Sequence, residues 1–106
     1  MTPQEAYLKC KNKKKRIPEL ESIIAIDSYY SYCYARDVIK GRWEECEKTI
    51  ANDSEWSYVY AYEVIKGPFY LCHPIIFNSE YKDGYINFLK SINYDFNEIS
   101  ECEWLI

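Results

Sequence analysis

The chain has 106 residues, enough for one domain, and its 48% hydrophobic and 28% charged residues are the balance of a globular protein rather than a disordered one. No apolar run is long enough to span a membrane, and Met1 opens no signal-peptide pattern, so we expect a cytoplasmic protein without membrane contact. The formal net charge of −4 combines a basic segment at residues 9–16 with an acidic remainder, which disfavours nonspecific nucleic-acid binding over most of the surface.

A 26-residue repeat organises the sequence. Residues 27–41 and 53–67 read almost alike without a gap, and weaker similarity continues on both sides. A fixed period of this size is typical of stacked supersecondary units. We therefore expect a single all-α domain, an α-solenoid-like stack of helix-turn-helix repeats whose degraded terminal units cap the stack. The expected units are residues 1–26, 27–52, 53–78 and 79–106.

Apolar spacing and capping residues predict the helices in chain order. The expected helices cover residues 3–14, 19–26, 28–40, 44–52, 54–66 and 85–92. Asp27 is expected to cap the first repeat helix, and Gly41 and Gly67 to supply the left-handed residues that end the repeat helices. The prolines in residues 68–74 are expected to shorten or replace the helix there, and Asp83-Gly84 to mark a break.

The repeat helix carries one apolar stripe, which we expect to face the core. In the first copy the stripe is Tyr30, Ser31, Tyr34, Ala35, Val38 and Ile39. Trp43 and Phe69 are expected to enter the core directly after each repeat helix, whereas Glu47 is expected to lie in water.

In the last unit, one inserted residue after Ser79 aligns Tyr85 with Tyr58. The terminal Trp104-Leu105-Ile106 either packs back as a cap or docks on a partner.

Five cysteines form an odd set without a C-x-x-C motif, at Cys10, Cys33, Cys46, Cys72 and Cys102. We expect reduced cysteines that act as small hydrophobic residues, with a zinc site at Cys72 and His73 as the alternative. Neighbours in sequence rarely form a thiolate–imidazole pair, and no phosphate-binding loop is present. The prediction is a protein without catalytic residues, metal or cofactor.

Residues 16–78 carry a resemblance to a known family, which is most specific over residues 34–47. They resemble a short tandem repeat of tailed bacteriophage and large DNA virus proteins, with the pattern Tyr-Ala-x-x-Val-Ile-Lys-Gly-Arg-Trp-Pro-Glu-Ala-Glu. The chain departs from it at Glu44, where Pro is usual, at Cys46, where Ala is usual, and throughout residues 68–74. The resemblance implies a viral accessory protein that acts in the host cytoplasm, with a helical repeat and no known catalytic residue.

The outward side of the repeat helices is the main candidate binding surface. Its residues are Tyr32, Arg36, Asp37, Tyr58, Tyr62 and Glu63. Tyr32 and Tyr58 border the core stripe, so the alternative for these two is packing against the neighbouring unit. Aromatic residues beside acidic ones suit protein recognition, and we expect their replacement to leave the fold intact. Together with the acidic, tyrosine-rich composition and the viral resemblance, these surface residues predict a monomer or small homo-oligomer. Its predicted partner is a host protein with a basic surface. The function expected is inhibition of a host complex such as a nucleic-acid-handling defence system.

The basic segment supplies the alternative function. Its cations are Lys9, Lys11, Lys13, Lys14, Lys15 and Arg16. Such a run can contact nucleic-acid phosphates with a strong dependence on salt. It also fits a solvated helix end, where cations suit the helix dipole, or a docking site for an acidic protein.

Overall fold

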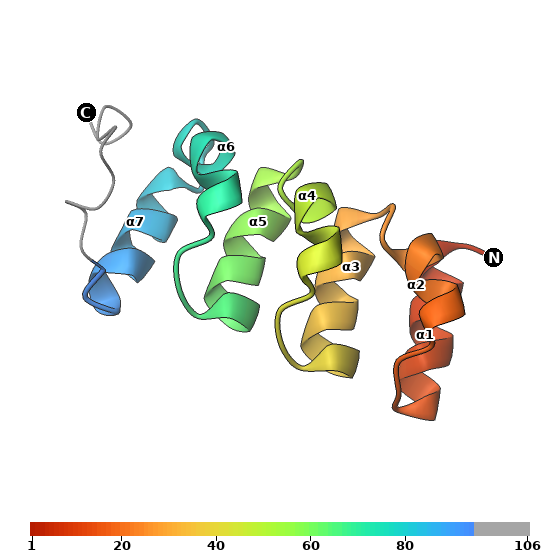
Figure 1. The fold of residues 1–106 in the computed structure, drawn as a ribbon. Helices are drawn as coiled ribbons and strands as arrows, with labels where there is room; N and C mark the ends of the chain where they lie inside the picture. The colour runs from red at the N-terminus through yellow and green to blue at the C-terminus, as the bar shows by residue number, and fades with distance from the viewer. Residues whose placement is uncertain (95–106) are drawn as a thin grey trace.

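Residues 1–94 are described by the computed structural model, and within them the chain is all-helical, without a strand (Figure 1). The α-helices are α1 (Pro3–Lys13), α2 (Pro18–Ile24), α3 (Ser28–Tyr34), α4 (Glu47–Ile50), α5 (Ser54–Tyr60), α6 (His73–Phe77) and α7 (Lys82–Ser91). Wider π turns extend α3 over Ala35–Ile39 and α5 over Ala61–Ile65, and 3₁₀ turns at Glu44–Cys46 and Tyr70–Cys72 precede α4 and α6. The terminal segment Trp104–Ile106, predicted as a cap or docking tail, lies outside the described residues.

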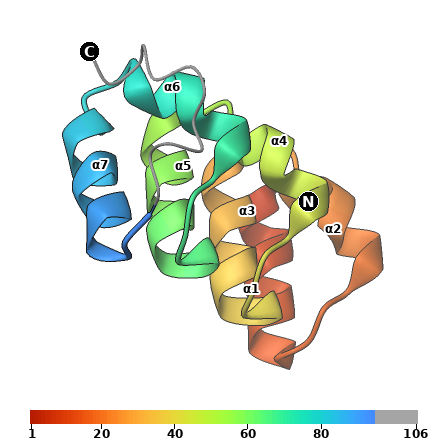
Figure 2. The ribbon, with the colours of Figure 1, turned by 60° about the vertical axis from the view of Figure 1, so that its left-hand side comes forward.

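The helices form two layers. The longer helices α1, α3, α5 and α7 lie side by side in one layer, and α2, α4 and α6 form the other (Figures 1 and 2). The molecule measures 44 × 21 × 19 Å and is longest along this row. The longer helices run in the same direction, so their carboxyl ends line one edge, the lower edge in Figure 1.

Helix caps recur at the repeat interval. The Asp27 carboxylate accepts from the backbone N–H of Tyr30 at 2.8 Å, and the Asp53 carboxylate accepts from that of Trp56 at 3.0 Å. Each bond satisfies one of the first N–H groups of a helix, which have no partner within the helix. The predicted cap at Asp27 is confirmed.

The small residues of the predicted stripe are fully buried between the layers. Ser31, Ala35, Ser57 and Ala61 all have 0% exposure. The Ser31 hydroxyl donates to the Ile24 carbonyl at 3.1 Å, and Ser57 makes the same bond one repeat later at 2.8 Å. A small side chain with a satisfied hydroxyl therefore lets the second-layer helix pack closely against the repeat helix, as the stripe predicted.

The left-handed residues at the ends of the repeat helices are lysines. Lys40 has φ 62° and Lys66 has φ 59°, while no described glycine has a positive φ. The assignment of this conformation to Gly41 and Gly67 is therefore wrong. In the π turn the Lys40 N–H bonds to the Ala35 carbonyl five residues back, at 2.7 Å. Because Lys40 makes this last hydrogen bond of the helix, the left-handed residue that ends the helix is Lys40 and not Gly41, which follows it.

Two predicted interruptions are helical instead. Pro74 lies in the first turn of α6, where its missing N–H removes no helical hydrogen bond, so the helix is neither replaced nor shortened. Asp83-Gly84 lies in the first turn of α7 rather than at a break. A Cβ on Gly84 would lie 3.0 Å from the Tyr58 hydroxyl, so the absent side chain allows α7 to approach α5 closely.

The aromatic residues after the repeat helices are in the core, as predicted. Trp43 is 3% exposed and Phe69 is 1% exposed, and the nearby Cys46 and Cys72 are fully buried.

Across residues 1–94, none of the helices combines the length and the apolar character that crossing a membrane requires.

Candidate functional site

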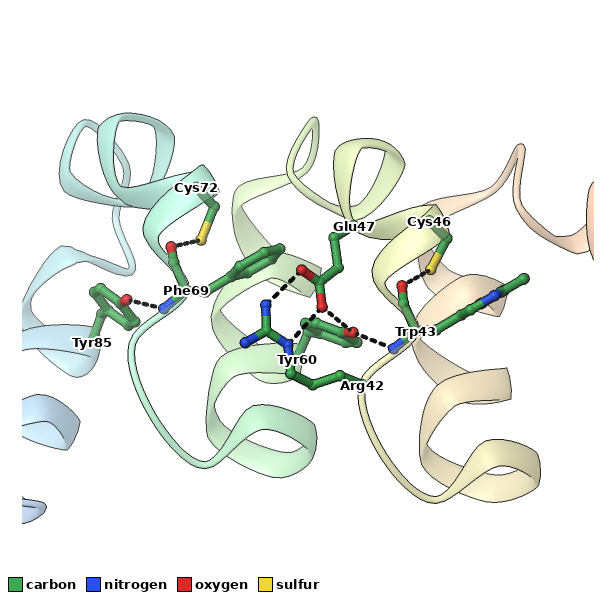
Figure 3. Close-up of polar contacts among 8 residues, drawn as sticks. All are labelled: Arg42, Trp43, Cys46, Glu47, Tyr60, Phe69, Cys72 and Tyr85. Carbon is green, nitrogen blue, oxygen red and sulfur yellow. Dashed lines mark hydrogen bonds and ion pairs between the residues drawn. The ribbon is translucent and has the colours of Figure 1, made fainter.

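A buried polar network joins consecutive units around Tyr60 (Figure 3). Glu47 is buried, forms an ion pair with Arg42 at 2.7 Å and accepts the Tyr60 hydroxyl proton at 2.8 Å. The Tyr60 hydroxyl in turn accepts from the Trp43 backbone N–H at 2.8 Å. We call these four residues the Tyr60 junction. The expectation that Glu47 lies in water is wrong, because its two partners together satisfy the carboxylate inside the fold.

The preceding unit has the same arrangement. Arg16 donates to Glu21 through Nε at 2.8 Å and through Nη2 at 3.0 Å, and the Tyr34 hydroxyl donates to Glu21 at 2.6 Å. The Ile17 N–H donates to the Tyr34 hydroxyl at 3.3 Å. The hydrogen bonds from Arg16 lower the pKa of Glu21. Arg16, predicted as a nucleic-acid contact, is thus held by its own chain.

The next unit replaces the ion pair with a histidine. The Tyr85 hydroxyl accepts from the Phe69 backbone N–H at 2.9 Å and lies 2.7 Å from His73 Nε2. We call Tyr85, His73 and Phe69 the Tyr85 junction. Burial lowers the pKa of His73 to about 4, so the imidazole is neutral near pH 7.

The register of α7 differs from the sequence alignment. Tyr85 occupies the place of Tyr60, not that of Tyr58. Tyr85 follows His73 by 12 residues, whereas Tyr60 follows Glu47 by 13. The last unit has therefore lost one residue at this point rather than gained one.

The cysteines have structural environments. The Cys72 thiol donates to the Phe69 carbonyl at 3.0 Å, and burial raises its pKa to about 12. A nucleophile or zinc ligand needs the thiolate, which this environment disfavours. Cys10, Cys33, Cys46 and Cys72 are free and buried, while Cys102 lies outside the described residues. In residues 1–94 no group of three or more His, Cys, Asp or Glu side chains is placed to hold a metal ion.

Tyr32 packs against the neighbouring helix rather than facing solvent, which is the alternative that its position beside the stripe left open. It is 3% exposed, and its ring stacks on that of Trp56 with centroids 5.6 Å apart. Its hydroxyl donates to Glu63 and accepts from Arg36 Nη1 at 2.9 Å. Burial and the bond to Glu63 raise the pKa of Tyr32 to about 12. The neighbouring helix α5 covers this tyrosine because adjacent repeat helices pack along their outer flanks.

Asp37 and Glu63 also contribute to helix packing. Asp37 accepts the hydroxyl proton of Tyr7 from α1, as Glu63 accepts that of Tyr32 from α3. Arg36 also pairs with Asp37 at 2.7 Å, and mainly this interaction lowers the pKa of Asp37 to about 2. The expectation that these carboxylates can be replaced without effect on the fold is not supported, since each accepts a hydrogen bond from the preceding long helix.

Tyr62 and Tyr58 belong to an aromatic cluster between α5 and α7. Tyr62 is 55% exposed, and its ring lies 5.1 Å from that of Phe88 and 6.3 Å from that of Tyr58. Tyr58 is half-buried and stacks on Tyr81 at 6.0 Å. Tyr62 is therefore an exposed aromatic ring supported by its neighbours, as its position outside the stripe predicted.

A second aromatic cluster, between α3 and α5, includes a residue that the sequence analysis missed. Tyr29 is 40% exposed, and its ring lies 4.6 Å from Trp56 and 4.8 Å from Tyr30. The helical period predicted that Tyr30, and Trp56 at the equivalent position of the next copy, lie inside, but both are only half-buried. The run of tyrosines after the Asp27 cap was the sequence signal for partly exposed aromatic rings, because one helix cannot bury all of them on a single face.

The basic segment lies beside lysines from later units. Lys11, Lys13, Lys14 and Lys15 are exposed, and Lys11 and Lys14 line a cleft of about 460 Å³ together with Lys40. Lys40 was not among the predicted nucleic-acid contacts, although Lys40 occupies the position of Lys14 one repeat later. The repeat alignment itself was the signal that could have identified it.

Charge is balanced over the described residues. Residues 1–94 contain thirteen acidic and thirteen basic residues, and the other four acidic residues lie in 95–106. The net charge of −4 therefore arises entirely from that terminal segment. Six of these basic residues and none of the acidic ones lie in the basic segment at residues 9–16, so the remainder of the described chain has seven basic and thirteen acidic residues and is acidic, as predicted.

Comparison with known proteins gives no relative: no protein-family model, no curated protein and no solved structure matches the chain. The resemblance of residues 16–78 to a viral repeat therefore stays a prediction.

Proposed function

We propose that the chain is a non-enzymatic protein-binding module built as an α-solenoid-like stack of helix pairs. Its binding surface is the outer side of α3, α5 and α7, where two aromatic clusters meet solvent. In helical repeat proteins such extended faces bind partners without any cofactor.

The observation that carries the proposal is the environment of Tyr62. Its ring is more than half exposed yet rests on Phe88 and Tyr58. A large side chain that is already ordered loses little conformational entropy when a partner covers it. Tyrosines of this kind are common anchors in protein interfaces. Tyr29 offers a second anchor, one helix away along the same layer.

The nature of the partner follows from two further features. The viral resemblance favours a bacteriophage source, and the partner is then a host complex such as a nucleic-acid-handling defence system, which the chain inhibits. A basic partner surface suits residues 95–106, which hold four acidic residues and no basic one. Binding through this segment would add electrostatic attraction to the aromatic contact.

The test is affinity capture from a nuclease-treated bacterial lysate, with the wild-type chain and Tyr62→Ala compared by quantitative mass spectrometry. We expect a host protein that the wild type retains and Tyr62→Ala loses, because truncating an anchor weakens binding by about 1 to 3 kcal/mol. Nuclease treatment removes retention through bridging nucleic acid.

Tyr70→Ala is the matched control, because Tyr70 is 59% exposed but precedes α6 in the other layer. This variant should retain the same protein as the wild type. Equal retention by all three chains, with equal melting temperatures, would show that the outer aromatic side is not the binding surface.

A further inference from the structure

Three lysines occupy equivalent positions along one edge of the molecule. Lys14, Lys40 and Lys66 are spaced by 26 residues, and each follows the carboxyl end of a long helix in the left-handed conformation. Those ends lie next to one another along the lower edge in Figure 1. We call these residues the lysine ladder.

Two clefts of matching composition lie along the ladder. One, of about 460 Å³, is lined by Lys11, Lys14, Asp37, Val38 and Lys40. The other, of about 230 Å³, is lined by Arg36, Lys40, Gly41, Glu63, Val64 and Lys66. Two ladder lysines line each cleft, together with a valine and a carboxylate at equivalent positions. Lys40 lines both clefts, so the two are neighbours along the edge.

The negative charges of these clefts already have hydrogen-bonded partners, whereas the lysines form no ion pair within residues 1–94, and Lys11 Nζ lies 5.8 Å from the centroid of the Tyr7 ring. Asp37 binds Arg36 and Tyr7, and Glu63 binds Tyr32. The ion pairs found in residues 1–94 all use arginine, so none includes Lys11 or a ladder lysine. The edge thus presents ammonium groups that no carboxylate of residues 1–94 approaches to ion-pair distance, although Lys11 contributes to the lowered pKa of Asp37.

The backbone conformation indicates that the lysine side chain is needed at these positions. The left-handed region disfavours every residue with a Cβ, and glycine is the usual residue there. The chain places glycine one residue later, at Gly41 and Gly67, where φ is not positive. A helix dipole favours a cation anywhere in the last turn, so it does not explain lysine at the strained position. Strain that recurs at an exposed site indicates function.

We propose that the lysine ladder binds the phosphate backbone of duplex nucleic acid without reading its sequence. Neighbouring packed helices are about 8 to 10 Å apart, so the three ladder lysines span about 16 to 20 Å. Each strand of a duplex places one phosphate per about 3.4 Å of helix axis, so an edge of this length faces several phosphates and can contact more than one of them. This site is separate from the aromatic surface and does not depend on the proposed protein partner.

The clefts fit phosphates better than an acidic protein. The planar guanidinium of arginine binds a carboxylate best, through two parallel hydrogen bonds. The lysine ammonium is a point charge that can bind a phosphate from many directions. The clefts contain no aromatic side chain to anchor a protein, only Val38 and Val64. Absence of aromatic rings also disfavours single strands, which bind by base stacking.

The test measures binding of short fluorescent DNA and RNA duplexes between about 50 and about 200 mM salt. With Lys11 and the three ladder lysines engaged, we expect micromolar binding at low salt and a log–log salt slope of about −3 to −4. Both duplexes should bind, since they share the phosphate backbone. The triple variant Lys14→Asn, Lys40→Asn and Lys66→Asn should reduce the slope to about −1 and the low-salt affinity more than tenfold.

Asparagine suits the test because Asn93 adopts the same left-handed conformation after α7, with φ 61°. The triple variant should therefore melt no lower than the wild type, which separates lost binding from lost folding. Lys48→Asn, at an exposed lysine of α4 in the other layer, is the control and should leave the slope unchanged.

Three results would overturn the proposal. The first is a triple variant that binds duplexes as the wild type does. The second is a polyglutamate peptide that binds the wild type at least as tightly as the duplexes, which would identify an acidic protein as the partner. The third is a single strand that binds more tightly than the duplex, which would require base stacking.

Discussion

The Tyr60 and Tyr85 junctions share one hydrogen bond from the backbone to a buried tyrosine but differ in the second partner of that tyrosine. In both, a buried tyrosine hydroxyl accepts from the backbone N–H of the aromatic residue that follows a repeat helix, at 2.8 Å to Trp43 and 2.9 Å to Phe69. The second partner differs, being the Glu47 carboxylate in one junction and the His73 imidazole in the other.

This difference shows which part of the repeat the fold requires. A buried carboxylate needs a cation, and Arg42 supplies it, whereas a neutral imidazole needs none. The position of Arg42 is accordingly occupied by Pro68 in the next unit. The bond from tyrosine to the backbone is common to both junctions, so it is the shared structural element, and the charged pair is replaceable.

The largest effect is expected from removing the shared hydroxyl. Tyr60→Phe leaves the Trp43 N–H without an acceptor and removes a hydrogen bond to a charged carboxylate, so it should lower the free energy of unfolding by about 4 kcal/mol. Tyr85→Phe removes a bond to a neutral partner instead and should cost about 2 to 3 kcal/mol. Urea denaturation of both variants measures the difference. A larger cost for Tyr85→Phe would reverse our ranking, and Tyr70→Phe is an exposed control.

A pH titration should distinguish the junctions next. The pKa of His73 falls from 6.5 in the unfolded chain to about 4 in the folded one. Between these values the unfolded chain binds more protons, so stability should fall as pH decreases from about 6.5 to about 4, by about 3 kcal/mol in total. His73→Gln keeps an acceptor that does not titrate and should lack this loss. Parallel stability curves for the two chains would contradict the assignment.

Exchanging one junction for the other tests the role of arginine. His73→Glu buries a carboxylate beside Tyr85 without a cation and should cost about 2 kcal/mol at pH 7. Adding Pro68→Arg restores the pattern of the Tyr60 junction and should recover about 1 kcal/mol. A double-mutant cycle measures the coupling, and zero coupling would mean that the charged pair does not stabilise the carboxylate.

The smallest effect concerns the helix ends below the junctions. Lys40→Gly removes the strain of a left-handed lysine, offset by the greater backbone freedom of glycine, and should stabilise the fold by about 0.5 to 1 kcal/mol. Lys48→Gly, in the helical conformation of α4, should destabilise it by a similar amount. Thermal melting compares the two, and destabilisation by Lys40→Gly would show that the lysine side chain itself supports the fold.

The repeat made much of the local structure predictable. A period of 26 residues with a cap at Asp27 and small residues at Ser31 and Ala35 predicted the long helices and their buried face. The prolines and glycines were less informative, because position within a helix decides their effect. Pro74 and Gly84 both lie in first turns, where the helix tolerates them.

The candidate surfaces were only partly predictable. Tyr62 is exposed as expected, but Tyr32 is buried because a helix 26 residues later covers it. The spacing within one helix cannot show how far the next helix extends over its flank. Only the packed layer decides which aromatic residues remain in contact with solvent.

The sequence by itself determined the helical class, the period and the small buried residues Ser31, Ala35, Ser57 and Ala61, because these depend on residue types and spacing along the chain. The tertiary structure decided the rest. It placed Glu47 inside, since Arg42 and Tyr60 reach it only in the folded chain, and it brought Lys14, Lys40 and Lys66 to one edge. These features depend on groups from different helices, and their energies depend on the distances and the burial that only packing creates.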